Sequence, residues 1–259
     1  KGRQESTEPE IEEAVLIWGN ENFSHFIFQY LTRLAVCFKK PFLLYKPVLL
    51  KRGLPPSYVE WMKRLGFTKF IYADDWVRVK RLWVPSVCCY RGNYEDEFVY
   101  LSDYACHALR AKLLPEKKGP ERVYLSRRRA THRRVLNEDE LLAKLPGFTV
   151  VEMEGLSVQE QLDAVSNAKF IVLTVGGTSA ITMFAPRDCT IIEMSNPYMV
   201  GTFGSTAWAS ILGQTFYRIH GKQVGDSSPR IDLDFTVDTE LVRALIIVAE
   251  AMKTPKLSA

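Results

Sequence analysis

Short apolar runs rich in β-branched and aromatic residues alternate along this chain with amphipathic helical patterns. The first run, AVLIW at 14–18, is followed by NFSHFIFQYLTRLAVCF at 22–38, where apolar residues recur every three or four positions. Alternation of this kind is typical of parallel sheets whose strands are joined by right-handed helical crossovers. The sequence therefore predicts an α/β fold.

The alternation runs through the chain twice. In the first half we expect further strands at 41–46, 69–73 and 81–85, a helix at 57–66 capped by Ser57, and a long helix at 96–114. In the second half we expect strands at 122–126, 148–153, 169–175, 189–194 and 215–219, with helices at 137–145, 157–168 and 238–252. Asn137 and Ser157 are the expected caps of the first two helices, and Ser157 and Glu160 have the spacing of a capping box.

The two halves are separated by PEKKGPE at Pro115–Glu121, where prolines, a glycine and charges are typical of a linker. A chain of 259 residues, 47% of them hydrophobic, can bury two cores. We therefore expect a disordered polar segment at 1–10 and two Rossmann-like domains, at 11–115 and 116–259, with a cleft between them. One continuous sheet is the alternative.

Composition restricts the class of partner. The net charge of +4 and the pI of about 8.7 are too weakly basic to argue for nucleic acid, and no aromatic residues interleave with the main basic run. The five cysteines form no zinc-type spacing, so we expect buried, reduced thiols and a cytoplasmic protein. No apolar run approaches the roughly 18–20 residues of a transmembrane helix, and we expect any membrane association to be peripheral, at the inner face.

Five arginines lie within eight residues in RVYLSRRRATHRRVLNEDELL (122–142), between a predicted strand and a predicted helix. Ligands of open parallel sheets bind at the carboxyl ends of strands. A following helix start offers free N–H groups, and guanidinium groups form paired bonds to phosphate oxygens. The run predicts an anion site that includes Arg127, Arg128 and Arg133; a solvated basic loop is the alternative.

A second candidate is TVGGTSA at 174–180, a glycine-rich turn that follows the predicted strand at 169–175. Gly176 and Gly177 would let the backbone approach a phosphate or ribose, while Thr178 and Ser179 offer hydroxyls. The turn has neither the Walker nor the GxGxxG spacing. A plain capped turn is the alternative.

Other polar residues are weaker candidates. His25 lies one turn into the first helix, where it could act as a general base or could be structural. Asp232 and Asp234 form a DxD, a spacing used to hold divalent cations, but they follow a polar loop rather than a core strand. We therefore expect no metal site there. His107 and His220 are interpreted as structural.

The second half of the chain resembles glycosyltransferase family 61, which includes bacterial polysaccharide enzymes, plant xylosyl- and arabinosyltransferases and animal O-linked N-acetylglucosaminyltransferases. The matching pieces occur in order: SR at 126–127, LNEDEL at 136–141, LSVQEQ at 156–161, FAP at 184–186 and IE at 192–193. ENFSHFIFQYLTRL at 21–34 is also similar to the first helix of that family. Each piece alone is short, whereas the ordered set is specific.

The resemblance implies two facing Rossmann domains in the GT-B arrangement, an acceptor domain followed by a donor domain. It also implies an inverting transfer of a sugar from a nucleotide sugar, expected to be a UDP-sugar, to a glycan hydroxyl, without a cofactor. Arg127 and Arg133 would contact the donor phosphates, and Glu193 is expected to bind ribose. If the chain is eukaryotic, the Golgi lumen is the expected location.

One position departs from the family. Where the family has HGAG, this chain has Val175 followed by Gly176, Gly177 and Thr178. Any role of that histidine is vacant here or has passed to a neighbouring hydroxyl. The rival interpretations are therefore a non-catalytic nucleotide-sugar or glycan-binding module and another polysaccharide-modifying group transferase.

Overall fold

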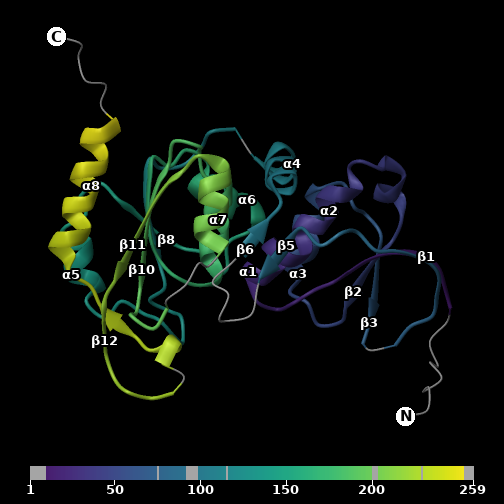
Figure 1. Ribbon diagram of the computed structural model, residues 1–259, viewed down its shortest axis with the longest axis horizontal. Helices are drawn as coiled ribbons and strands as arrows, with labels where there is room; N and C mark the ends of the chain where they lie inside the picture. The colour runs from purple at the N-terminus through teal and green to yellow at the C-terminus, as the bar shows by residue number, and fades with distance from the viewer. Residues whose placement is uncertain are drawn as a thin grey trace, which may run out of the picture. The chain divides into compact units, whose positions relative to one another are not determined.

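The chain forms two compact α/β units, Lys1–Leu114 and Pro115–Ala259, each with its own parallel sheet (Figure 1). The computed structural model describes residues 10–74, 76–91, 99–114, 116–199, 204–228 and 230–253. Because the two main sheets are separate, the alternative of one continuous sheet is excluded. Nine of the ten residues of the segment expected to be disordered, and Pro115 of the expected linker, lie outside the described residues.

The first unit is built on a four-stranded parallel sheet in the order β3-β2-β1-β4. Its strands are β1 (Ile11–Trp18), β2 (Val48–Lys51), β3 (Phe70–Ala73) and β4 (Val79–Trp83), and β5 (Cys89–Arg91) pairs with β6 (Val99–Leu101) in a separate antiparallel ribbon. Its helices are α1 (Phe23–His25), η1 (Phe26–Leu31), α2 (Thr32–Cys37), η2 (Pro41–Tyr45), α3 (Pro56–Arg64) and α4 (Asp103–Leu113).

Three sequence predictions in this unit were wrong. The run at 41–46 is the 3-10 helix η2, and the strand begins later, at Val48. The helix expected at 96–114 begins only at Asp103, because Ser102 caps it and the preceding residues form β6. Ser57 does not cap α3, since the helix starts one residue earlier behind Pro55.

The second unit has a five-stranded parallel sheet in the order β11-β10-β9-β7-β8. Its strands are β7 (Arg122–Ser126), β8 (Thr149–Glu152), β9 (Phe170–Thr174), β10 (Thr190–Ser195) and β11 (Thr215–His220), with the short pair β12 (Lys222–Gln223) and β13 (Phe235–Thr236). Its helices are α5 (Glu138–Ala143), α6 (Val158–Ser166), η3 (Gly177–Phe184), α7 (Gly204–Leu212), η4 (Arg230–Asp232) and α8 (Thr239–Lys253). The capping box of Ser157 and Glu160 is confirmed, whereas the Asn137 side chain caps nothing and instead donates to the Val237 carbonyl at 2.9 Å.

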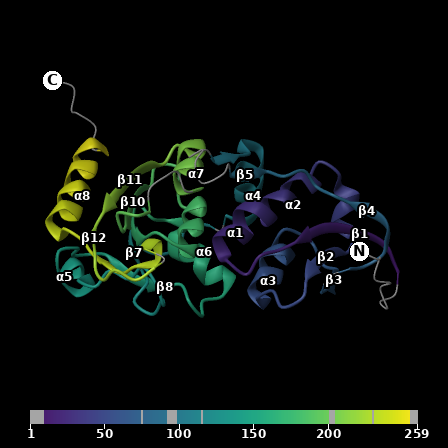
Figure 2. The ribbon, with the colours of Figure 1, turned by 60° about the horizontal axis from the view of Figure 1, so that its bottom comes forward.

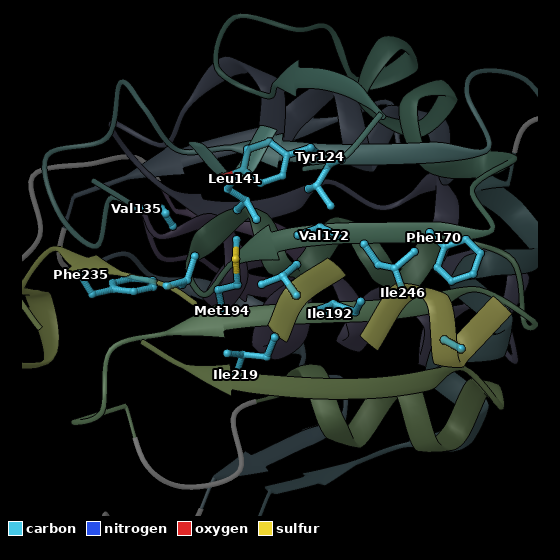
Figure 3. Packing of buried hydrophobic residues seen from close by; sticks show 14 residues of the cluster. Tyr124, Val135, Leu141, Phe170, Val172, Ile192, Met194, Ile219, Phe235 and Ile246 are labelled. Atoms are coloured by element: carbon cyan, nitrogen blue, oxygen red, sulfur yellow. The ribbon is translucent and has the colours of Figure 1, made fainter. Parts of the chain in front are cut away.

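Helices cover both faces of the second sheet. α5 and α8 lie on one face, and α6 and α7 lie on the other (Figure 2). On the α8 side, Val172, Ile192 and Ile219 from neighbouring strands pack with Ile246 of the helix, and Phe235 of β13 closes one end of the cluster (Figure 3). Helical cover on both faces leaves the ends of the strands as the exposed part of the sheet.

The positions of the cysteines agree with the expectation of buried thiols. All five cysteines are free and buried, and burial raises the pKa of Cys37 to about 11 and that of Cys106 to about 12. Across the described parts of the chain, no helix combines the length and the apolar character needed to span a bilayer.

The strand orders identify where a ligand should bind in each unit. In chain order, the second sheet reads 2-1-3-4-5, in which the direction of winding reverses between β7 and β9. The first sheet reads 3-2-1-4, with its reversal between β1 and β4. Ligands of open α/β sheets bind outside the carboxyl ends of the strands at this reversal. The loops after β7, β9 and β1 are therefore the places to examine.

Candidate phosphate-binding site

Backbone strain occurs at one non-glycine residue in the described part of each unit. Among the described residues, Trp18 and Arg133 are the non-glycine residues with positive φ, at 68° and 58°. Trp18 ends β1, and Arg133 lies in the loop after β7. A side chain with a Cβ costs roughly 1–2 kcal/mol in this region, and such strain gathers at functional sites. Arg133 therefore lies in one of the loops that the strand orders select, and Trp18 directly precedes another.

Most arginines of the loop after β7 are neutralised by nearby carboxylates. Arg128 donates hydrogen bonds to Glu138 at 2.6 Å and to Asp139. These bonds raise the pKa of Arg128 above its ordinary value. Arg129 pairs with Glu152 at 2.7 Å. The Arg128 side chain is thus committed to the start of α5, which corrects its expected place in the phosphate site.

Asp234 holds a fourth arginine of the loop and explains the DxD spacing. Both the backbone N–H and the guanidinium of Arg134 donate to its carboxylate, at 2.8 and 2.6 Å. Although burial alone would raise it, these bonds hold the pKa of Asp234 below its ordinary value. Asp232 lies 3.8 Å from Arg133 Nε, and its carbonyl accepts from the Arg133 N–H. Both DxD carboxylates therefore face arginines.

The positive charges of Arg127 and Arg133 are the least compensated in this loop. Burial lowers the pKa of Arg127, and the charge of nearby Arg133 lowers it further, against a smaller opposing effect of Glu154. Within the described part of the chain, the buried Nε atoms of Arg127 and Arg133 have no hydrogen-bond partner. Arg127 Nη2 donates to the His132 carbonyl at 3.3 Å. Two close guanidinium groups with unused donors favour a bound anion.

The glycine-rich turn after β9 contacts Arg127 directly. A Cβ built on Gly176 would lie 2.8 Å from Arg127 Cζ, so only a glycine lets the guanidinium lie against this backbone. Ser179 Oγ accepts from the Gly176 N–H at 3.1 Å and shapes the turn that leads into η3, which begins at Gly177. The turn and the loop after β7 therefore form one site.

Two hydroxyl groups in and beside the glycine-rich turn have unused hydrogen-bonding capacity. Thr174 Oγ1, at the end of β9, and Thr178 Oγ1, in the turn, are buried without a partner among the described residues. Buried polar atoms without partners are rare in proteins, and each needs a reason. A ligand with oxygen atoms at this edge of the sheet would supply the missing partners of the hydroxyls and guanidinium groups.

Glu193 and Val175 do not face this ligand position with free groups. The Glu193 carboxylate is fully buried and accepts from Arg218 at 2.6 Å and from Ser205 at 2.8 Å. In this arrangement it is a structural ion pair between β10 and β11, not the ribose ligand that the sequence suggested. Val175 is 4% exposed, and its N–H donates to the Met194 carbonyl, so its role is packing.

The strained end of β1 leads to His25. Asn22 Oδ1 accepts from the His25 N–H at 3.3 Å, and His25 immediately precedes η1, a six-residue π-helix. Such helices are rare and frequent at functional sites. The His25 side chain is half-buried and has no hydrogen bond to another described residue. The imidazole at this sheet edge is available to a ligand.

Sequence reasoning missed the segment that supports the arginine loop. Asn196, after β10, donates to the carbonyls of Arg230, Ile231 and Leu233 at 3.0–3.2 Å, which fixes the 230–234 segment beside the loop. The sequence signal was the asparagine of SNPY directly after a strand. Its partners lie more than thirty positions away, and no local pattern identifies them.

Replacing Gly176 with alanine should separate binding from folding. The added Cβ displaces the Arg127 guanidinium, so we expect inorganic pyrophosphate affinity to fall about tenfold, in line with the loss of a charge-assisted bond. Since the backbone of Gly176 is extended, the melting temperature should stay near that of the wild type. Gly213→Ala is the control: its φ of 70° predicts lower stability with unchanged pyrophosphate affinity. If calorimetry gives the same pyrophosphate affinity for both variants, the result contradicts this site.

Comparison with known proteins identifies a family for this chain. The family model for glycosyltransferase 61 matches residues 23–192, about two thirds of the chain. A solved structure, E. coli heptosyltransferase WaaC with ADP, is similar with a TM-score of 0.49 and 10% identity, over 93% of this chain and 98% of that one. None of the curated proteins matches this sequence. Because the family model spans more than half of the chain, this protein belongs to the glycosyltransferase 61 family, and it is a glycosyltransferase enzyme.

Proposed function

We propose that this enzyme transfers a sugar from a UDP-sugar to a hydroxyl of a glycan or polysaccharide, with inversion at the anomeric carbon. The observation that carries the proposal is the site formed by Arg127, Arg133 and Gly176 at the winding reversal of the second sheet. Unused guanidinium donors there suit the diphosphate of a nucleotide sugar.

The chemistry explains why these arginines would speed the reaction. As the acceptor oxygen forms its bond to the anomeric carbon, the bond to the leaving phosphate oxygen breaks and that oxygen gains negative charge. Preorganised cationic donors stabilise this charge more in the transition state than in the bound donor. Each such donor contributes on the order of 2–4 kcal/mol. Partial burial of Arg127 strengthens the effect because less water screens its charge.

In the proposal, the first unit binds the acceptor and supplies the base. His25 follows β1 at the winding reversal of that sheet, with an imidazole that has no hydrogen bond to other described residues. An imidazole can take the acceptor proton near neutral pH. The proposal requires the two units to bring these sheet edges together across a cleft, as in the GT-B arrangement, when both substrates are bound.

A non-catalytic nucleotide-sugar-binding module is the second candidate, and Val175 favours it. Its side chain is apolar and buried at the position where the family has a histidine, so this chain lacks whatever that imidazole supplies. Slow hydrolysis of a UDP-sugar by the purified protein would support an enzyme. Binding of UDP without any turnover of a panel of UDP-sugars would support the module.

Arg127→Ala should weaken UDP binding by about 1.5–3 kcal/mol, the range for bonds to charged groups. The physical reason is the loss of a guanidinium whose Nε donor has no hydrogen-bond partner among the described residues. Arg129→Ala is the matched control, since that arginine belongs to the same loop but is exposed and paired with Glu152. Titration calorimetry of both variants tests this assignment. If the Arg127→Ala variant binds UDP with the same affinity as the Arg129→Ala variant, Arg127 does not belong to the site.

Activity should survive chelation of divalent cations. Arginines supply the positive charge opposite the diphosphate, and Asp234 of the DxD is already bonded to Arg134. We expect the rate of sugar transfer in excess EDTA to stay within about twofold of the untreated rate. Complete loss of activity that manganese or magnesium restores would instead assign Asp232 and Asp234 to a metal.

His25→Ala should lower turnover by roughly 10²–10⁴-fold, the usual contribution of a general base, and leave UDP affinity nearly unchanged. The residue is half-buried, so the melting temperature of the variant is measured in parallel. His107→Ala is the control, because that histidine lies on α4 and pairs with Asp103. Turnover within a few-fold of wild type, or a fall that only follows the loss of folded protein, would rule out His25 as the base.

A further inference from the structure

A serine and a histidine meet at the carboxyl edge of the second sheet, outside the site described above. Ser195 and His220 are the last residues of β10 and β11 and are paired in register. Ser195 Oγ lies 3.0 Å from His220 Nδ1, and the Asn196 carbonyl lies 3.4 Å from the same nitrogen. Ser195 is fully buried, whereas His220 is exposed. The contact with the buried serine therefore orients the exposed imidazole.

The partners of Nδ1 determine which ring nitrogen remains available. A carbonyl oxygen can only accept a hydrogen bond, so the Asn196 carbonyl favours the tautomer with the proton on Nδ1. In that tautomer Nε2, which no described residue binds, carries a lone pair and accepts a hydrogen bond. The strand end thus presents one oriented acceptor to a ligand.

The surroundings of His220 are also fixed. Gly221 directly after it donates to the Ser195 carbonyl at 2.8 Å, and a Cβ at Gly221 would lie 2.5 Å from the Phe235 ring. Tyr198, whose N–H donates to the Asn196 side chain at 3.0 Å, carries the Arg230 guanidinium over its ring at 5.3 Å and accepts from it at 3.0 Å. The oriented imidazole therefore belongs to a supported edge and not to a free loop.

The position of this edge relative to the phosphate site follows from the sheet. β9, which leads into the Gly176 turn, and β11, which ends at His220, flank β10 in a parallel sheet. Strands are about 4.8 Å apart, so the two ends are separated by about 10 Å along one edge. This separation is comparable to that between the diphosphate and the base of one nucleotide.

We propose that His220 Nε2 accepts a hydrogen bond from the nucleobase of the donor, with Ser195 as its positioning residue. The inference rests on the proposed function, because it assigns the diphosphate to Arg127, Arg133 and the Gly176 turn. The uracil ring of a UDP-sugar has an N–H at N3 that can donate to such an acceptor. His220 lies beyond residues 23–192, so the family match does not include it.

The test compares the two ends of the ligand by calorimetry with UDP and inorganic pyrophosphate. His220→Ala should weaken UDP binding about 3–10-fold, as expected for one neutral hydrogen bond, and leave pyrophosphate binding unchanged. His220→Gln, whose amide oxygen can accept, should recover part of the UDP affinity. Arg127→Ala should weaken the binding of both ligands, and His107→Ala, a change at a half-buried histidine of α4, should weaken neither.

A second comparison uses UDP methylated at N3 of the uracil, which lacks the N–H. The wild-type protein should bind UDP more tightly than the methylated compound, and the His220→Ala variant should bind the two equally. Unchanged UDP affinity in His220→Ala, or an equal loss for UDP and pyrophosphate, overturns the assignment of His220 while the proposed function stands. Wild-type protein that binds pyrophosphate but not UDP overturns the proposed nucleotide donor itself.

Discussion

Concentrated positive charge on the loop after β7 is the constraint on which this site depends. Like charges this close repel, so the fold must bring carboxylates to them from elsewhere in the second unit. The start of α5 supplies Glu138, β8 supplies Glu152, and the 230–234 segment supplies Asp234. These pairings fix the loop against its neighbours. Arg127 is left with no carboxylate bonded to it among the described residues and lies against the backbone of Gly176.

The same sheet geometry places the strained residues of the two units. Trp18 ends the first strand of one parallel sheet, and Arg133 lies in the loop that follows the first strand of the other, each at the winding reversal of its sheet. Neighbouring crossovers diverge there. A loop in that position can hold a side chain in an unfavourable conformation only if tertiary bonds fix it. For Arg133, the N–H donated to Asp232 and the bonds of adjacent Arg134 do so.

The sequence predicted what depends on local patterns and missed what depends on distant partners. β7, β9 and the Ser157 capping box follow from apolar runs and cap spacing within a few residues, and all were found. The run at 41–46 was misassigned because a short apolar stretch fits a strand or a helix equally well. The Arg134–Asp234 bond joins residues one hundred positions apart, and the Glu193–Arg218 pair exists only because β10 and β11 are neighbours. Pairing of this kind decides which charged residues remain available to a ligand, so Arg127 could be predicted as a candidate but could not be separated from Arg128.

The family match includes one part of the proposed donor site and ends before the other part. Residues 23–192 include the arginine loop, the Gly176 turn and His25, and they end before Ser195 and His220. A diphosphate is common to all nucleotide donors, and its recognition requires the same cationic groups whatever base is attached. The base differs between donors, and a single oriented acceptor such as His220 Nε2 discriminates against any base that lacks a matching N–H, since an unpaired polar group would remain. In the proposal, the groups that hold the diphosphate therefore follow β7 and β9, and the acceptor for the base ends β11, on the other side of β10 in the same sheet.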